Sequence, residues 1–277
     1  MFLAQGFSQS NSDKYRDTVN DFAAKVADLD VTVVSAPPPT AVGVMIEEEY
    51  LPKLNCVSQV QLLSYMHSGI SEDVVTIDLA SALIQHNDEY IYFRTDHHWT
   101  QLGAYYAYTA FCEKAGLTAQ PLSKFEQGQH DNFVGSMYYY LSDYPQSKIL
   151  KDEPDTLYYY RPFVEIDTNY YMDATMDMAY GIGTISYVDE DTSNKYLCFL
   201  GGDHPVTIIE TDVQGPVCML IKESYGNAFA PWLTSHYSRV IVIDPREFNR
   251  DGKPSLDLAT FAVEQGVDDC IILNYPM

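Results

Sequence analysis

Short continuous runs of apolar and β-branched residues alternate along the chain with longer segments in which apolar residues recur at helical spacing. The short runs are typical of strands buried on both faces of a parallel sheet, and the longer segments are typical of amphipathic helices. Strands are predicted at residues 31–34, 74–77, 90–93, 196–200, 206–209, 217–221, 240–243 and 270–273. Helices are predicted at residues 13–28, 55–69, 79–85, 101–115, 225–233 and 255–266. This alternation predicts a layered α/β core.

The alternation is interrupted between residues 117 and 200. Residues 131–200 hold twelve of the 23 tyrosines, in part as short runs at 138–140 and 158–160 that are bounded by turn residues. Aromatic runs of this kind favour strands. We therefore predict an α/β core in two parts, residues 1–116 and 201–277, with residues 117–200 inserted as a strand-rich subdomain. Its tyrosines either pack a sheet or form an aromatic platform for sugar rings.

The chain is strongly acidic, with 39 Asp and Glu residues against 16 Lys and Arg residues and a net charge of −23. This charge disfavours nucleic acid and anionic membrane surfaces as partners. No run of apolar residues reaches the roughly eighteen that a bilayer-spanning helix needs, so no such helix is expected. Residues 1–7 are too short and too uncharged to be a signal peptide.

Candidate chemistry is concentrated in residues 94–100, Arg-Thr-Asp-His-His-Trp-Thr, between a predicted strand and a predicted helix. Loops in this position often carry the reactive groups of α/β proteins. Asp96 and His98 point the same way if the segment is extended, and a carboxylate that orients a histidine is half of a hydrolytic triad. His97 is expected to point to the opposite side and to have a structural role. Trp99 either forms a wall of the site or, as we expect, packs beneath the start of the helix.

The sequence gives little indication of a metal site. The five cysteines are widely spaced and include no CxxC pair. Asp96, His97 and His98 are all metal-ligand types, but neighbouring residues rarely bind one ion together, and no spaced partner such as H-E-x-x-H is present. We therefore expect no metal and no other cofactor.

The second candidate is Ser224, between a predicted strand and a predicted helix. A serine at such a turn projects from the carboxyl edge of the sheet, where an activated nucleophile is found. The amides of Tyr225, Gly226 and Asn227 would then face an anion that forms on the substrate, and Gly226 would allow close approach of the backbone. Alternatively, Ser224 is simply the N-cap of the helix. The upstream Asp-x-His pair favours the catalytic interpretation, because it supplies a base and a group that orients the base.

Residues 94–100 and the following Gly-Ala-Tyr-Tyr-Ala-Tyr segment at 103–108 resemble the signature of the DHHW family. Residues 199–205 (Phe-Leu-Gly-Gly-Asp-His-Pro), 222–227 (Lys-Glu-Ser-Tyr-Gly-Asn) and 243–246 (Ile-Asp-Pro-Arg) resemble the same family in the same order. The resemblance covers most of the chain. That family is similar to the SGNH hydrolases and, more closely, to the alginate O-acetylation proteins of bacterial envelopes.

The resemblance implies a flavodoxin-like, SGNH-like three-layer α/β/α fold with a central, mostly parallel sheet. It also implies that an Asp-x-His pair precedes the catalytic serine, and these residues match Asp96, His98 and Ser224. Finally, it implies export, often with an N-terminal membrane anchor, which this chain lacks.

Four further residues are expected around Ser224. Glu223 and Asp203 stand where the family pattern leads us to expect aspartate and asparagine. An extra carboxylate opposes a developing oxyanion by about 4 kcal/mol at a separation of about 4 Å and an effective dielectric near ~20, so either these side chains point away or activity is weak. Arg246 follows the strand after the nucleophile strand, and it either contacts substrate or pairs with an acid. Asn274, after the last strand, is a candidate donor to an oxyanion.

These residues predict a serine-dependent acyl transferase or esterase that acts on acetyl groups of an extracytoplasmic glycan. Ser224 would attack the acyl carbonyl, His98 would move the proton and Asp96 would hold His98. The expected partners are a glycan, neutral or amino-bearing because the chain is so acidic, and an acyl donor delivered by a membrane acyltransferase. The protein is expected outside the cytoplasm, secreted or anchored through a segment absent from this chain. The alternative is a catalytically degenerate module for glycan binding or assembly.

Overall fold

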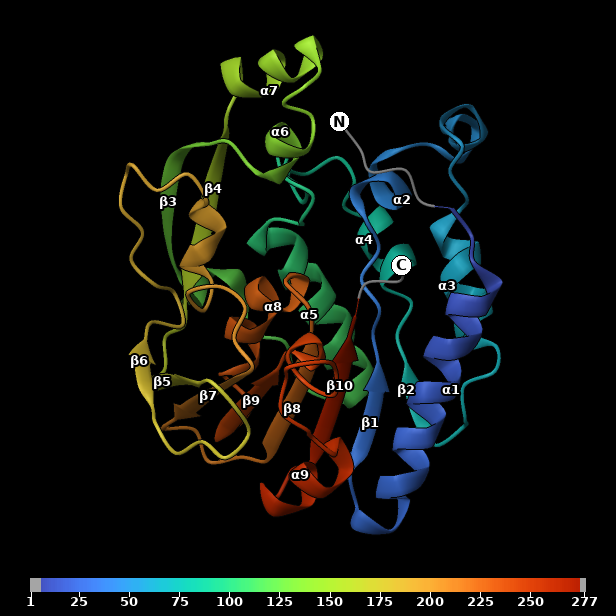
Figure 1. The fold of residues 1–277 in the computed structure, drawn as a ribbon, viewed down its shortest axis with the longest axis vertical. Coiled ribbons are helices and arrows are strands. Elements are labelled where there is room, and N and C mark those ends of the chain that lie inside the picture. Colours follow the sequence, from blue (N-terminus) through green and yellow to red (C-terminus); the bar gives the residue numbers. More distant parts are fainter. Residues whose placement is uncertain (1–5, 275–277) are drawn as a thin grey trace.

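The buried apolar runs pair into one eight-stranded sheet in the computed structural model, which describes residues 6–274 (Figure 1). The strand order is β2-β1-β10-β8-β9-β7-β5-β6. The strands of this sheet are β1 (Thr32–Ser35), β2 (Val74–Thr76), β5 (Ile166–Tyr171), β6 (Tyr180–Ile182), β7 (Val206–Thr211), β8 (Val217–Lys222), β9 (Arg239–Ile243) and β10 (Asp269–Leu273).

Five of these strands, β2, β1, β10, β8 and β9, pair in parallel. The remaining three, β7, β5 and β6, extend the sheet by antiparallel pairing. The predicted α/β fold with a central, mostly parallel sheet is therefore confirmed. β10 comes from the end of the chain but lies between β1 and β8, so it joins the early and late parts of the core.

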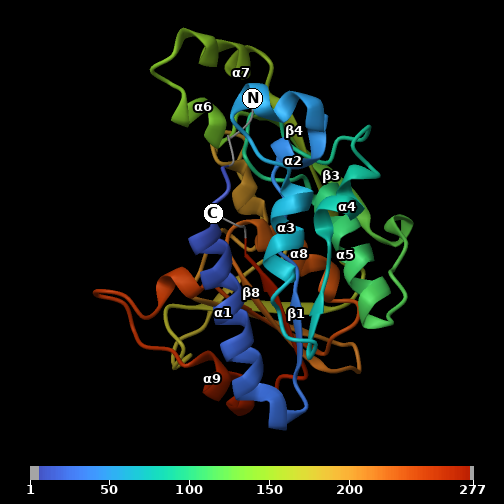
Figure 2. The same cartoon turned by 90° about the vertical axis from the view of Figure 1, so that its right-hand side faces the viewer.

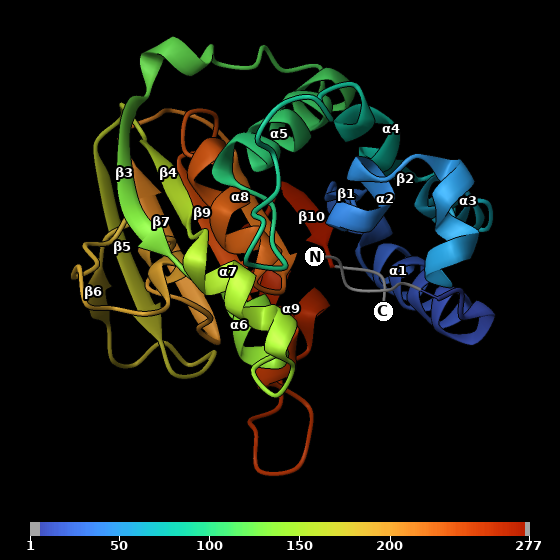
Figure 3. The ribbon, with the colours of Figure 1, turned by 90° about the horizontal axis from the view of Figure 1, so that it is seen from above.

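Helices cover both faces of the sheet, as Figures 2 and 3 show from two directions. The helices are α1 (Gln9–Val26), α2 (Ala41–Met45), α3 (Gln59–His67), α4 (Leu79–Ile84), α5 (Gln101–Ala115), α6 (Ser136–Tyr140), α7 (Lys148–Asp152), α8 (Tyr225–Leu233) and α9 (Leu258–Glu264). One core contains buried side chains of α5 and α8, and the other contains buried side chains of α1 and α9. Within residues 6–274, no helix has the length and apolar character that crossing a membrane requires.

Three local predictions are wrong. Residues 90–93 form only a single bridge, between Tyr92 and Trp99, because their backbone bonds to the loop that follows instead of to a neighbouring strand. Residues 196–200 overlap a short 3₁₀ helix, Lys195–Cys198, which buries the side chains of Tyr196 and Cys198 without joining a sheet. The tyrosine run at 138–140 lies in α6.

Residues 117–200 do not stand wholly apart from the central sheet. β3 (Glu126–Phe133) and β4 (Asp155–Arg161) form a separate two-stranded antiparallel sheet, and between them the segment with α6 and α7 rises beyond the carboxyl edge of the central sheet (Figure 1). β5 and β6, in contrast, belong to the central sheet itself, where β6 is the edge strand and β5 lies between β6 and β7. The division of the chain at residues 117 and 200 stays a prediction.

Candidate active site

Residues 91–100 form a closed loop that carries the Asp-x-His pair. The N–H of Phe93 donates to the carbonyl of His98 at 3.3 Å, and the N–H of Thr100 donates to the carbonyl of Ile91 at 2.9 Å. The Thr100 hydroxyl then caps α5 by accepting a hydrogen bond from the N–H of Gly103. The loop therefore returns to its starting point before the helix begins.

The Asp155 carboxylate, fully buried at the start of β4, fixes this loop. It accepts hydrogen bonds from the Tyr90 hydroxyl, from the N–H and Nε of Arg94, and from the N–H and hydroxyl of Thr95, the last two at 2.7 and 2.6 Å. A buried carboxylate is stable only when its oxygens are paired and hydrogen-bonded in this way. The loop conformation that satisfies Asp155 is also the one that presents Asp96 and His98.

The three predicted catalytic side chains lie in one hydrogen-bonded row. Ser224 Oγ is 2.7 Å from His98 Nε2, and His98 Nδ1 is 2.6 Å from Asp96 Oδ1. Because a carboxylate can only accept, Nδ1 carries the proton and Nε2 is free to accept the proton of Ser224. Burial alone would raise the pKa of Asp96, but the adjacent His98 and the N–H of Ser136 hold that pKa well below its usual range. Asp96 is therefore ionised at neutral pH.

Two aromatic residues, one stacked on His98 and one next to it in the sequence, contact the backbone of Ser224 or its neighbour. The Tyr196 ring stacks on the His98 imidazole, with 4.0 Å between centroids and 9° between planes, and its hydroxyl donates to the Ser224 carbonyl at 3.0 Å. Trp99 is fully buried and donates from Nε1 to the Tyr225 carbonyl at 3.0 Å. Trp99 thus packs beneath the site, while Tyr196 contacts the His98 ring and the backbone carbonyl of Ser224 directly.

Ser224 does not act as a side-chain cap of α8, because its hydroxyl makes no bond to the amides of that helix. The expectation that the next three amides face an anion is wrong for Gly226 and Asn227. The N–H of Tyr225 bonds to the Glu223 carboxylate, and the N–H groups of Gly226 and Asn227 bond to the backbone carbonyls of Glu223 and Ser224. The amides of Gly226 and Asn227 therefore close the first turn of a helix that starts immediately after the serine, whereas the N–H of Tyr225 faces a carboxylate next to Ser224 Oγ.

Gly226 also has a role other than the predicted one. A Cβ at this position would lie 2.3 Å from the Lys222 Cβ, far inside normal contact distance. The glycine is therefore required for packing of α8 against the end of β8.

The Glu223 side chain points toward the Ser224 hydroxyl. Its Oε2 lies 3.2 Å from Ser224 Oγ and 3.2 Å from the N–H of Tyr225. Burial raises the pKa of Glu223, which favours its neutral form. The Ser224 hydroxyl thus has a second acceptor, but the histidine is closer.

Asp203 belongs to a network of compensating charges beside the site. Its carboxylate accepts from Lys222 Nζ and Asn227 Nδ2, each at 2.8 Å, and from Arg246 at 2.7 Å. Arg246 and Lys222 also pair with the buried Asp244. Although burial alone would raise it, the pKa of Asp203 is held well below the usual range by Lys222, Asn227 and Arg246. Arg246 therefore has ion-pair partners, and it is not among the residues that line the cavity beside Ser224.

The expectation that His97 points away from His98 is wrong. Residues 94–98 form bends and not an extended strand, so the two rings lie 3.8 Å apart between centroids. His97 Nδ1 is 2.5 Å from Ser136 Oγ. Burial and the neighbouring His98 lower the pKa of His97 to about 4, so its ring is neutral at pH 7. This hydrogen bond agrees with the structural role that was expected for it.

The Asp96, His97 and His98 ligand atoms lie within 4.8 Å of one another, which is close enough for a shared ion. However, each residue already has a hydrogen-bond partner, in the pairs His98–Asp96, His98–Ser224 and His97–Ser136. An ion would have to break the row that leads to the serine. The five cysteines are buried free thiols and offer no further ligand cluster.

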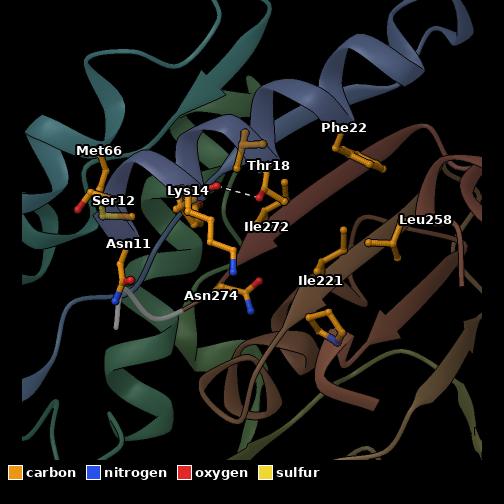
Figure 4. A pocket seen from close by; sticks show the side chains of 13 residues that line it. Asn11, Ser12, Lys14, Thr18, Phe22, Met66, Ile221, Leu258, Ile272 and Asn274 are labelled. Carbon is orange, nitrogen blue, oxygen red and sulfur yellow. Dashed lines mark hydrogen bonds between the residues drawn. The ribbon is translucent and has the colours of Figure 1, made fainter. Parts of the chain in front are cut away.

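Two cavities lie near the carboxyl edge. One, of ≈310 Å³, is lined by Asp96, His98 and Ser224, together with residues of α6. The other, of ≈410 Å³, lies on the face covered by α1 and α9, and Figure 4 shows Asn274 among its lining residues with Ile221 and Ile272. Asn274 was predicted near an oxyanion but lines the second cavity, because side chains alternate along the strand and Asn274 follows Ile272 on that face of the sheet.

Several residues of the site were missed in the sequence, and all of them lie between residues 117 and 200. They are Gly135, Ser136, Tyr139, Tyr140, Asp155 and Tyr196. Gly135 allows the start of α6 to touch the motif, since a Cβ there would lie 2.3 Å from the Asp96 Cβ. Of these residues, only the tyrosine run at 138–140 stood out in the sequence. We predicted that it forms a strand whose tyrosines either pack a sheet or form a platform for sugar rings.

The chain matches the model of one protein family and is similar to several solved structures. A family model described as DHHW protein matches residues 2–243. A DHHW family protein from Eubacterium siraeum is 30% identical, with a TM-score of 0.83 over 99% of this chain and 86% of that one. PatB1 from Bacillus cereus, solved with a sulfonyl adduct, is 18% identical, with a TM-score of 0.77 over 99% of this chain and 91% of that one. No functionally curated protein matches the chain.

A third structure shares the fold at lower similarity. The O-acetyltransferase domain of Pseudomonas putida AlgJ is 14% identical, with a TM-score of 0.52 over 98% of this chain and 85% of that one. At this identity, as for PatB1, the likeness shows the fold alone. The predicted SGNH-like architecture agrees with both structures.

We expect Asp155→Asn to lower the free energy of unfolding by about 2–4 kcal/mol, because an amide N–H₂ would face the donors of Thr95 in a buried site. Arg94→Gln is the matched control. The Arg94 side chain is 59% exposed, so its ion pair with Asp155 should contribute no more than about 1 kcal/mol. Urea unfolding of both variants measures the difference. Equal losses in the two variants would mean that Asp155 does not fix the loop.

Proposed function

The chain belongs to the DHHW family, and on that basis we propose that it is a serine-dependent acyl transferase or esterase that acts on acetyl groups of a glycan. The observation that carries the proposal is the row of hydrogen bonds from Ser224 Oγ through His98 to Asp96, at 2.7 and 2.6 Å. This arrangement matches the roles of nucleophile, general base and orienting acid.

In the proposed reaction, Ser224 Oγ attacks the acyl carbonyl while its proton passes to His98 Nε2. The ionised Asp96 stabilises the imidazolium that results. When the tetrahedral intermediate collapses, His98 returns the proton to the departing group and the acyl group stays on Ser224. A sugar hydroxyl or water then attacks the acyl-serine in the same way, which gives transfer or hydrolysis respectively.

The proposal includes transfer of an acetyl group and a location of the protein outside the cytoplasm. The AlgJ domain of similar fold is an O-acetyltransferase by name, and we extend that class to this chain because of its serine, histidine and aspartate. Donation of the acyl group by a membrane acyltransferase and a location outside the cytoplasm follow from the same resemblance.

A second candidate, a glycan-binding or assembly module without activity, is favoured by the position of Glu223. Its Oε2 is 3.2 Å from Ser224 Oγ. An oxyanion formed by attack of Ser224 would therefore develop close to this carboxylate, and an ionised carboxylate would oppose the transition state. Two features reduce this opposition. Burial raises the pKa of Glu223, and displacement of its carboxylate by the acyl oxygen would release the N–H of Tyr225 as a donor.

We expect the protein to hydrolyse an aryl acetate, and we expect Ser224→Ala and His98→Ala each to reduce kcat/KM by at least about 10³-fold. His97→Ala should keep most of this activity but lower the free energy of unfolding by about 1–2 kcal/mol, because the bond to Ser136 and the ring contact are lost. Steady-state kinetics and urea unfolding measure the two effects.

Hydrolysis that is equal in the protein and in Ser224→Ala would rule out the serine mechanism. Loss of activity in His97→Ala with retention in His98→Ala would assign the base to the other imidazole. An inactive protein that gains Ser224-dependent hydrolysis in Glu223→Gln would identify the carboxylate as the group that silences a degenerate site.

A further inference from the structure

The cavity in front of Ser224 has an aromatic wall. Tyr139 and Tyr140 of α6 line it, and 52% and 65% of their surfaces are exposed to solvent. Large aromatic side chains that remain this exposed beside a reactive group offer flat apolar faces to a ligand. With ≈310 Å³, the cavity can hold a single ring.

The cavity offers no cation to a ligand. Among the described residues, no lysine or arginine lines it. The three cations nearest to the motifs are occupied, with Arg94 Nε 3.1 Å from Asp155, Lys222 Nζ 2.8 Å from Asp203 and Arg246 2.7 Å from Asp203. A positive pocket formed by these residues, which could have held an acidic sugar, is therefore absent from the lining.

His97 also lines the cavity but adds no charge at neutral pH. Burial and His98 lower its pKa to about 4. The charged groups that remain in the wall are the carboxylates of Asp96 and Asp203, each already paired. A carboxylate on the ligand would thus meet acids and no cation.

One buried hydrogen-bond acceptor, on Asn227, belongs to the cavity wall. Asn227 is 1% exposed, and its amide orientation is set by the bond from Nδ2 to Asp203. Its Oδ1 has no hydrogen-bond partner although it is buried and the residue lines the cavity. A buried acceptor of this kind is satisfied by a ligand hydroxyl or amine.

We propose that this cavity binds a sugar unit without acidic groups, stacked on Tyr139 and Tyr140 with a hydroxyl or amine donating to Asn227, and that it excludes uronic-acid units. The inference rests on the proposed function, since it assigns the acyl acceptor. The net charge of −23 acts in the same direction, because it repels a polyanion over a Debye length of about 8 Å at physiological salt.

The test is calorimetric titration with three β-1,4-linked tetrasaccharides, of glucose, glucosamine and mannuronate, at low and high salt. We expect the glucose or the glucosamine tetrasaccharide to bind at least about tenfold more tightly than the mannuronate. Tyr139→Ala/Tyr140→Ala should weaken that binding about tenfold, the ratio that loss of one stacked ring pair produces. Both side chains are largely exposed, so the variant should fold.

Tyr144→Ala is the matched control, because Tyr144 is 60% exposed in the same segment but does not line the cavity. Its affinity should stay within about twofold of the parent protein. The inference is overturned if mannuronate binds most tightly, if neither of the other tetrasaccharides binds measurably, or if the double variant binds like the control. Aryl-acetate hydrolysis involves no sugar, so Ser224-dependent hydrolysis together with any of these results would remove this inference and leave the proposed function standing.

Discussion

The buried carboxylate of Asp155 is the constraint on which the candidate site depends. It receives donors from Tyr90, Arg94 and Thr95, and a buried carboxylate without any of these donors would destabilise the fold by several kcal/mol. Only a loop bent back on itself brings these donors to one carboxylate. That bend places Asp96 and His98 at the carboxyl edge of the sheet, opposite the turn after β8. The orientation of the histidine is therefore decided before any substrate arrives, which is the condition for efficient proton transfer.

The residues that meet in the row could be predicted because each lies in a local pattern with a physical meaning. A serine between a buried strand and a helix, and an Asp-x-His pair ahead of another helix, both belong at the carboxyl edge of a parallel sheet. The five parallel strands were predictable for the same reason, since β-branched runs report burial on both faces. Failures occurred where a neighbour distant in sequence decides the structure. The orientation of His97 depends on a bend that Asp155 imposes from about sixty residues away. The amides of Gly226 and Asn227 are bound by the backbone carbonyls of Glu223 and Ser224 in the first turn of α8.

The part of the chain that was hardest to interpret supplies most of the supporting groups. Gly135 and Ser136 contact Asp96, Tyr196 stacks on His98, and Tyr139 and Tyr140 line the cavity. These residues come from residues 117–200, where tyrosines are frequent and periodicity is weak. Aromatic residues suit a sheet face, a helix over a cleft and a stacking surface alike, so composition alone could not separate these roles. For Arg246 the sequence left an ion pair with an acid as one of two alternatives, but it could not identify Asp203 as the partner, because the pairing joins the ends of different strands.

The central claim is that Ser224 is a nucleophile activated by His98, and covalent labelling tests it most directly. A sulfonyl fluoride reacts with an activated serine by forming an Oγ–S bond and releasing fluoride, while the histidine takes the hydroxyl proton. After treatment with phenylmethanesulfonyl fluoride, peptide mass spectrometry should find the sulfonyl group on Ser224, and His98→Ala should slow the labelling at least about 10³-fold. An unlabelled Ser224 in the folded protein, or labelling at the same rate in His98→Ala, would contradict the account.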